Sequence, residues 1–302
     1  MELQMKPKKN KRNRKFIPRD LSGWAILLPS VFLFFMIVWR PIVIGVLYSF
    51  FDLKGFTPSE FIGLQNYRNV LADTNFLQTL SNTVRYVLWS LLIGFPLPFI
   101  CAVILNEMIY GQSYFKISIY LPVVIPVIAT SMIWRMVYME GPGGLLNMIL
   151  YRFGIEPMVW LNNKSLTIPL ILVSMTWNSF GRTMIMYLST LQGVNQELYE
   201  AARLDGAGIW GRIKYVLFPH MRGIMLLMLV SQIIGVFNIT EQPLAMTGGG
   251  PNGASMSLGL TNYFYAFKYS QYGKSLALGV VIFFILSVLT FVYFRMDKNV
   301  ND

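Results

Sequence analysis

Charged residues are scarce in this sequence. Only 13% of its 302 residues are charged and 55% are hydrophobic, whereas soluble domains carry roughly 25% charged residues. The composition therefore indicates a membrane protein and excludes an ordinary soluble domain. Cysteine is almost absent as well. The single one, Cys101, falls in an apolar segment, so an intrachain disulfide is excluded.

Acidic residues and histidine are missing from the long apolar stretches. None of the six stretches described below contains Asp or Glu, and the only histidine, His220, lies in a polar loop. Ion-coupled carriers commonly relay protons or bind Na⁺ through such groups inside the membrane. Their absence argues against a self-sufficient channel or secondary carrier for small solutes, which remains the alternative function.

Catalytic and nucleotide-binding patterns are absent too. The sequence has no Gly-x-x-x-x-Gly-Lys-Ser/Thr phosphate loop, no zinc-ligand spacing and no nucleophile–base pair. We therefore expect a non-enzymatic chain with no catalytic residue, no metal site and no cofactor of its own. Energy for transport would then come from another protein.

Six apolar stretches are long enough to cross a bilayer, which takes about 20 helical residues. They lie near residues 24–51, 82–106, 115–138, 167–192, 223–240 and 273–294. The sequence thus predicts an all-α polytopic membrane protein with six transmembrane helices. This transmembrane domain occupies residues 23–295, between tails at 1–22 and 296–302.

Basic residues are concentrated at the N-terminus, where eight of the 25 lysines and arginines precede Asp20. Lysine and arginine are enriched on the cytoplasmic side of membrane proteins. With the N-terminus in the cytoplasm, the cytoplasmic segments hold 15 basic residues and the outer segments six. Both termini are therefore expected in the cytoplasm. The formal charge of +11 reflects this topology and does not predict a nucleic-acid partner.

Polar residues form two stripes within the spans. Ser174, Asn178 and Arg182 are spaced i, i+4, i+8 and so share one helix face. A second, weaker stripe consists of Ser231, Gly235 and Asn238. An arginine facing lipid is costly, so Arg182 should face a cavity or another helix. We interpret Ser174, Asn178, Arg182 and Asn238 as candidates for a solute pathway. Hydrogen bonding between helices is the alternative.

The polar segment at 195–220 has the composition of two short helices joined at glycine. It contains Glu200-Ala201-Ala202-Arg203-Leu204-Asp205-Gly206-Ala207. Asn195 is suited to cap the first helix and Gly206 to end it, whereas Pro219 should end the second. Such a hairpin fits docking onto another protein, and an amphipathic hairpin resting on the inner leaflet is the alternative.

A glycine loop, Thr247-Gly248-Gly249-Gly250-Pro251, lies in an outer segment. Three glycines before a proline permit backbone conformations that other residues resist. An ordinary exposed turn is the alternative interpretation.

These motifs together resemble a known family. Glu200-Ala201-Ala202, Asp205-Gly206-Ala207 and Pro219 are similar to the EAA loop of ABC importer permeases. Further residues resemble the maltose-transporter-type sugar permeases, in particular the first of their two permease subunits. These are the glycine loop, Tyr263, Ala266-Phe267, Tyr272-Gly273, Ser275-Leu276-Ala277, Trp177 with Gly181, and Asn162. The similarity extends from about Trp24 to Arg295.

The resemblance implies the permease fold of a type I importer in the bacterial inner membrane. Its partners would be a second homologous permease, two cytoplasmic ABC ATPase subunits that use ATP and Mg²⁺, an extracytoplasmic solute-binding protein and the lipid bilayer. The solute would be a carbohydrate, most simply an oligosaccharide, and Arg182 raises the narrower hypothesis of an acidic one.

The resemblance also implies roles for individual residues. Glu200 would pair with a basic group of the ATPase, and the bend between the two helices would form at Asp205 and Gly206. The small residues that allow a close fit would be Ala201, Ala202 and Ala207, before Pro219. The outer loop of Gly248, Gly249, Gly250 and Pro251 would help to dock the solute-binding protein.

Overall fold

The computed structural model describes residues 19–301, so most of the basic tail predicted at 1–22 lies outside the described residues. The chain divides into two compact units, residues 1–48 and 49–302, which we describe separately. The first unit is one helical stretch, made of α1 (Arg19–Phe34), a π-helical turn (Phe35–Trp39) and α2 (Arg40–Tyr48). Neither the π-helical turn nor α2 contains a buried residue.

The second unit is helical apart from one antiparallel hairpin of β1 (Phe51–Lys54) and β2 (Thr57–Phe61). Its first helices are α3 (Gln65–Leu71), α4 (Phe76–Trp89), α5 (Pro96–Glu107), α6 (Gln112–Val124), α7 (Val127–Val137) and α8 (Leu145–Arg152). They are followed by α9 (Thr167–Leu191), α10 (Gln196–Leu204), α11 (Ile209–Arg212), α12 (Phe218–Phe237), α13 (Glu241–Thr247), α14 (Leu258–Tyr263) and α15 (Tyr272–Asn301). Three π-helical turns lie at Ser90–Gly94, Ile213–Leu217 and Phe264–Lys268.

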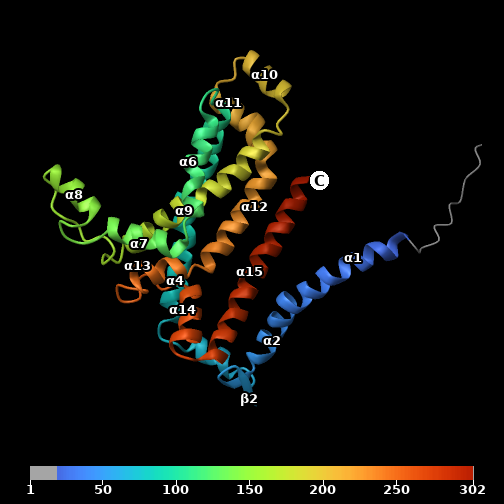
Figure 1. Cartoon of the computed structure of the whole chain (residues 1–302), viewed down its shortest axis with the longest axis vertical. Coiled ribbons are helices and arrows are strands. Elements are labelled where there is room, and N and C mark those ends of the chain that lie inside the picture. Colours follow the sequence, from blue (N-terminus) through green and yellow to red (C-terminus); the bar gives the residue numbers. More distant parts are fainter. Residues whose placement is uncertain (1–18, 302) are drawn as a thin grey trace, which may run out of the picture. The chain divides into compact units, whose positions relative to one another are not determined.

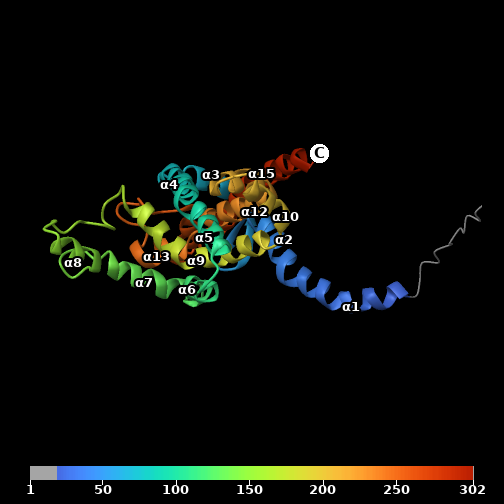
Figure 2. The same ribbon diagram turned by 90° about the horizontal axis from the view of Figure 1, so that it is seen from above.

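Helix α9 lies at the centre of the second unit, in contact with α4, α5, α6, α7, α12 and α13 (Figures 1 and 2). Twelve of its 25 residues are buried, against four of 20 in α12. Because protein surrounds α9, its polar residues need not face lipid. This position explains how a helix of spanning length can carry Ser174 and Asn178, which are buried, whereas Arg182 remains exposed.

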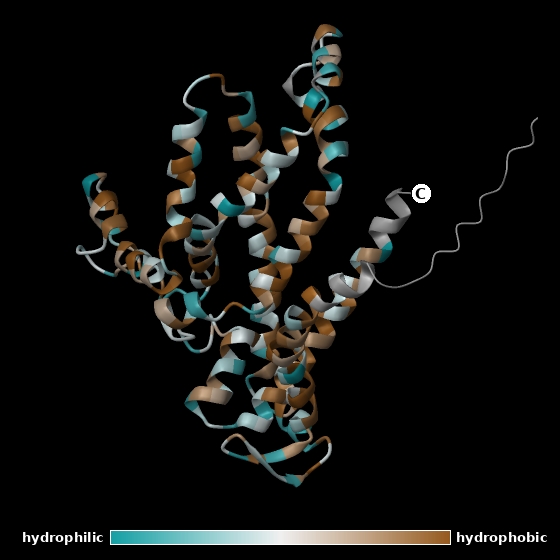
Figure 3. Cartoon of the chain, turned by 45° about the vertical axis from the view of Figure 1, so that its right-hand side comes forward, coloured by the Kyte–Doolittle hydropathy of each residue, from teal (hydrophilic) through white to brown (hydrophobic). Residues whose placement is uncertain are grey.

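Four helical segments are long and apolar enough to cross a membrane, and five if a bent pair is counted as one. The four are Ile26–Tyr48, Phe76–Glu107, Trp210–Phe237 and Tyr272–Arg295. Helix α9 has the length but is less apolar, so the predicted number of six spans stays a prediction. Figure 3 shows hydrophobic residues all along the long helices. Side chains such as Phe283, Phe291 and Phe294 are exposed on α15, as expected where lipid or a partner helix covers them.

The stretch predicted as a span at 115–138 is not one continuous helix. Helices α6 and α7 meet at an angle of 98°, with Ile125 extended at ψ 129° between them. The residue before a proline disfavours the helical region, and Pro126 follows Ile125. The break is held from α9, because Asn178 Nδ2 donates to the carbonyl oxygens of Pro122 (2.8 Å) and Ile125 (3.2 Å).

The prediction that Pro219 ends the second loop helix is also wrong. The chain stays helical from Trp210 to Phe237. The π-helical turn at Ile213–Leu217 lets the N–H of Phe218 bond to the Ile213 carbonyl. Pro219 then occupies the first turn of α12, where its missing N–H is tolerated. The wider turn therefore joins the loop to the span instead of separating them.

Candidate functional site

The loop between α9 and α12 has the capped, bent geometry that its sequence predicts. The Asn195 side chain accepts a hydrogen bond from the N–H of Glu197 (2.9 Å) and so caps α10. Gly206 follows the helix with φ +79°, and the Ala207 N–H bonds back to the Ala202 carbonyl (3.0 Å). This six-residue closure is a Schellman turn, and its positive φ strongly favours glycine.

The coupling loop, as we call residues 195–220, presents an exposed surface. Glu200, Ala201, Asp205, Gly206 and Pro219 are exposed, and Ala202 and Ala207 are half-buried. Helix α10 lies at the end of the second unit opposite to α14 and the β-hairpin (Figure 1). The small residues leave room for a partner surface to approach closely.

Two large apolar side chains on this surface were not singled out by sequence. Leu204 is 88% exposed and Trp210 is 80% exposed. Leu217, further along the same helical stretch, is buried, whereas Trp210 is not. Exposed Trp and Leu beside small residues are typical of an interface covered by another surface.

A cluster of three side chains ties the coupling loop to α5. The Tyr199 hydroxyl donates to Glu107 Oε1. Arg212 Nη1 lies 3.6 Å from Glu107 Oε2, with its guanidinium 4.8 Å from the centre of the Tyr199 ring. Tyr199 directly precedes Glu200, so the cluster joins α10 to Glu107 of α5 and to Arg212 of α11. Sequence reasoning missed this cluster because its members are up to 105 positions apart in the chain.

The first polar stripe is divided between the interior and the surface of the chain. Ser174 and Asn178 are buried, and Ser174 Oγ lies 3.2 Å from Met246 Sδ. Ser174 thus contacts α13, and Asn178 binds the break between α6 and α7. For these two residues the structure shows the hydrogen bonding between helices that was the alternative to a solute pathway. Arg182 and Asn238 are exposed, and Arg182 makes no hydrogen bond or ion pair within the described part of the chain. The pathway role stays a prediction for all four.

The glycine loop is held tightly against α4. Gly248 (φ +60°) and Gly249 (φ +91°) adopt left-handed conformations. Gly249 is also buried, and Met256 Sδ occupies the space that a side chain at this position would need. Four side chains on one side of α4 bind the following residues. Gln78 donates to the Asn252 carbonyl, Asn82 to those of Gly253 and Met256, Tyr86 to that of Ser255, and Thr83 accepts from the Leu258 N–H. This loop is therefore a packed element, unlike an ordinary exposed turn.

Two hollows open on either side of the glycine loop. The first, of about 390 Å³, is lined by the start of α4, Gly248–Gly250 and residues of α14 and the following turn. The second, of about 850 Å³, is lined by α7, α13 and Asn162. Both lie outside the coupling loop. Among residues 19–301, no group of three or more His, Cys, Asp or Glu side chains is placed to hold a metal ion.

A half-buried ion pair lies beside the first hollow. Lys274 Nζ is 2.7 Å from Asp73 Oδ2, and the Tyr265 hydroxyl donates to the same oxygen at 2.7 Å. Partial burial would raise the pKa of Asp73. Hydrogen bonds from Lys274, Tyr265 and the Asn75 N–H outweigh it and lower that pKa from 3.8 to about 2. Burial and the bond to Asp73 raise the pKa of Tyr265.

Replacing Asp73 by Asn is expected to lower the melting temperature at pH 7 and to flatten its dependence on acid pH. A carboxylate whose pKa is lowered on folding stabilises the fold above its unfolded pKa, and this stabilisation disappears between about pH 4 and pH 2. Its size at neutral pH is at most about 2 kcal/mol. Thermal unfolding of the detergent-solubilised protein against pH would measure it. Asp52→Asn, on the exposed hairpin, is the control, and equal pH profiles for both variants would contradict the assignment.

Comparison with known proteins agrees with this arrangement. Residues 94–302, more than half of the chain, match the family described as binding-protein-dependent transport system inner membrane component. The chain is 27% identical over 289 residues to the arabinooligosaccharides transport system permease protein AraP of Bacillus subtilis, covering 94% of this chain and 91% of AraP. It is 30% identical over 284 residues to the probable ABC transporter permease protein YurN of the same organism, covering 91% and 97% of the two chains.

A solved structure shares the fold. A chain in the crystal structure of a bacterial ABC transporter involved in the import of the acidic polysaccharide alginate superposes with a TM-score of 0.83 at 22% identity. The match covers 94% of this chain and 97% of that one. The trehalose/maltose transport system permease protein MalF of Thermococcus litoralis is 27% identical over 281 residues, covering 93% and 95%. This protein therefore belongs to the family of binding-protein-dependent transport system inner membrane components, and its curated relatives include permeases of sugar ABC transporters.

Proposed function

We propose that this chain is one of the two permease subunits of an ATP-driven importer, and that it forms part of the pathway for a carbohydrate. The observation that carries the proposal is the exposed coupling loop, with its small residues and Schellman turn, at the opposite end of the unit from α14 and the β-hairpin. A chain with no phosphate loop of its own needs a surface that binds an ATPase, so that ATP hydrolysis there can drive its conformational change.

In this proposal two cytoplasmic ATPase subunits supply the energy. Glu200 pairs with a basic group in a cleft of one ATPase, and the exposed Leu204 and Trp210 fill apolar space around it. Closure of the ATPases on ATP and Mg²⁺ then displaces α10. The Glu107–Tyr199–Arg212 cluster passes the displacement to α5 and α12, which supports a rigid-body switch between inward-open and outward-open states.

The proposed topology has six spans with both termini in the cytoplasm of a bacterial cell, in the inner membrane. The four apolar segments, the bent α6–α7 pair and α9 together supply six crossings. The coupling loop then faces the cytoplasm, and the glycine loop faces an extracytoplasmic solute-binding protein. In support, a second alginate transporter structure is a complex with an alginate pentasaccharide-bound periplasmic protein.

The proposed solute is an oligosaccharide, since several relatives are named for arabinooligosaccharides, multiple sugars or trehalose and maltose. Arg182 and Asn238, both exposed on this chain, are the side chains best placed to face a pathway shared with the second permease. An exposed guanidinium at mid-helix also keeps an acidic sugar among the candidates, because its charge has no partner within the described residues.

Reconstitution would test the proposal. Proteoliposomes containing this chain, its partner permease and the ATPase should take up labelled oligosaccharide only when ATP is inside and the loaded binding protein outside. Liposomes without the ATPase are the control. Flux in that control would favour the self-sufficient channel or carrier, and no flux in the complete system with any carbohydrate would contradict carbohydrate import.

A further inference from the structure

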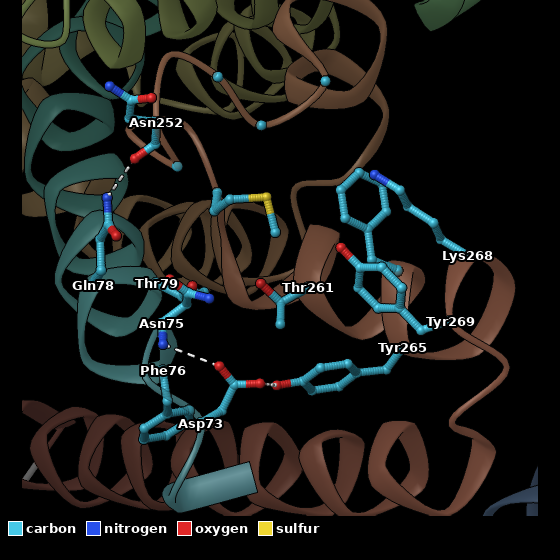
Figure 4. Close-up of a pocket in the computed structure, with 16 residues that line it drawn as sticks. Asp73, Asn75, Phe76, Gln78, Thr79, Asn252, Thr261, Tyr265, Lys268 and Tyr269 are labelled. Atoms are coloured by element: carbon cyan, nitrogen blue, oxygen red, sulfur yellow. Dashed lines mark hydrogen bonds between the residues drawn. The ribbon is translucent and has the colours of Figure 1, made fainter.

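The first hollow beside the glycine loop has the size of a small-molecule site. Its volume of about 390 Å³ lies within the range of about 300–1,000 Å³ typical of ligand pockets. Figure 4 shows it between the start of α4 and the turn that carries Lys268 and Tyr269. The α4 bonds to the glycine loop fix the near wall, since Gln78 donates to the Asn252 carbonyl at 3.0 Å. The hollow is therefore formed before any ligand arrives.

An unpartnered hydroxyl lies in the wall of this hollow. Thr261 is 8% exposed, and its Oγ1 has no hydrogen-bond partner among the described residues. Figure 4 shows this side chain directed into the hollow. A buried polar group without a partner costs about 1–3 kcal/mol, so such groups commonly mark the place of a missing hydrogen-bonding group.

The other lining groups have complementary chemistry. Amide side chains are supplied by Asn75, Gln78 and Asn252, and an aromatic ring by Tyr269, which is half exposed. Lys268 Nζ lies 4.4 Å from the centre of the Phe264 ring and has no acidic partner within the described chain, so its N–H groups are available as donors.

Asp73, the only acidic residue of the lining, is already neutralised by Lys274 at 2.7 Å. The hollow thus offers hydroxyl, amide and ammonium groups beside several aromatic rings, with no unpaired negative charge. A molecule with many hydroxyl groups and an apolar face satisfies all of these groups at once. A sugar ring has both.

We propose that this hollow is a carbohydrate subsite, which holds one unit of the transported oligosaccharide at the outer end of the chain, with a sugar hydroxyl bonded to Thr261. It is separate from the polar stripe of α9 and from the coupling loop. This inference rests on the proposed function, because the ligand is a unit of the proposed solute. We commit to a sugar as the occupant because the lining combines hydroxyl, amide and ammonium groups with aromatic rings, and a side chain of the solute-binding protein is the competing occupant that the test below separates.

Thr261→Val tests the subsite with little risk to folding, because valine has the same shape and the hydroxyl it removes has no partner. The complete permease–ATPase complex in nanodiscs, without binding protein, would be titrated with maltotriose, arabinotriose and a mannuronate trimer. Binding would be followed by calorimetry and by the rise in melting temperature. We expect at least one trimer to bind the natural complex. The same trimer should bind the Thr261→Val and Tyr269→Ala complexes about tenfold more weakly. Without sugar, the melting temperature of the Thr261→Val complex should be no lower than that of the natural complex.

Thr190→Val is the control, since Thr190 is a half-buried threonine whose hydroxyl is bonded within α9 and which does not line the hollow. Sugar binding by this variant should equal that of the natural complex. Unchanged sugar binding in both test variants would overturn the subsite, as would the absence of trimer binding in the natural complex. A Thr261→Val complex that binds sugar normally but binds the solute-binding protein weakly would also overturn it. ATP-dependent uptake by proteoliposomes of the same complex, with the loaded binding protein outside, keeps the two proposals apart. Uptake with unchanged sugar binding refutes the subsite alone, and no uptake of any carbohydrate refutes the function.

Discussion

Replacing Gly206 by arginine is expected to reduce solute uptake by about tenfold or more while the chain remains in the membrane. Gly206 has φ +79°, and no atom of the described residues lies within 4 Å of where its Cβ would be. The new Cβ therefore causes no clash with the described residues, and the side chain starts from the surface proposed to enter the ATPase. A bulky charge at the centre of a close interface costs 2 kcal/mol or more, so we expect uptake to fall by about tenfold or more. Glu200→Lys, which reverses the proposed pair, should act in the same direction.

Gly154→Arg is the matched control. Gly154 has φ +72°, is exposed and likewise has open space around its missing Cβ. Both variants carry the same backbone strain of roughly 1–2 kcal/mol for a left-handed non-glycine residue, but only Gly206 lies on the coupling loop. Uptake of labelled solute, membrane content and ATPase co-purification would be measured for both. Normal uptake in Gly206→Arg, or equal loss in the two variants, would count against the coupling role.

Replacing Gly181 by leucine is expected to prevent folding of the second unit. A Cβ at this position would lie 2.4 Å from the Ile119 carbonyl oxygen and 3.1 Å from Tyr120 Cα. Both atoms are backbone of α6, so no side-chain rotation relieves the clash and the two helices must separate. Overpacking of this kind costs about 1–3 kcal/mol, and more where backbone must move. Little monodisperse protein should be recovered after detergent extraction, and it should melt at a lower temperature.

Gly235→Leu is the corresponding control, because Gly235 is also helical and has no atom within 4 Å of its missing Cβ. Size-exclusion profiles and melting temperatures of the two variants would be compared. We expect Gly235→Leu to match the natural protein. Equal recovery of both variants would show that α6 and α9 do not depend on close contact at Gly181.

Local signals in the sequence were sufficient for the coupling loop. Asn195 caps α10 and Gly206 ends it, because capping by a side chain and a positive φ are properties of single residues and their near neighbours. Pro219 was misjudged for the same reason. Its effect depends on whether the preceding turn widens, and the π-helical turn at Ile213–Leu217 removes the clash that a regular helix would create.

Local signals in the sequence could not predict contacts between residues far apart in the chain. Pro126 does break the apolar stretch at 115–138, but a proline also occurs inside a continuous helix at Pro29, so its presence alone does not decide. The bend persists because Asn178, 52 positions away, binds the freed carbonyls. The same holds for Glu107 with Arg212, and for Thr261, whose missing partner is visible only once its neighbours are in place.

The sequence by itself determined that this is a membrane chain with a capped, bent polar loop at 195–220, because composition, capping and glycine conformation are local properties. Only the tertiary structure decided which polar residues hold helices together and which are left for a ligand or partner. Ser174, Asn178 and Arg182 share one face of the helix by spacing. Ser174 and Asn178 are nevertheless buried and hydrogen-bonded, whereas Arg182 is exposed. Burial depends on what the rest of the chain packs against each side chain, and helical spacing cannot supply that.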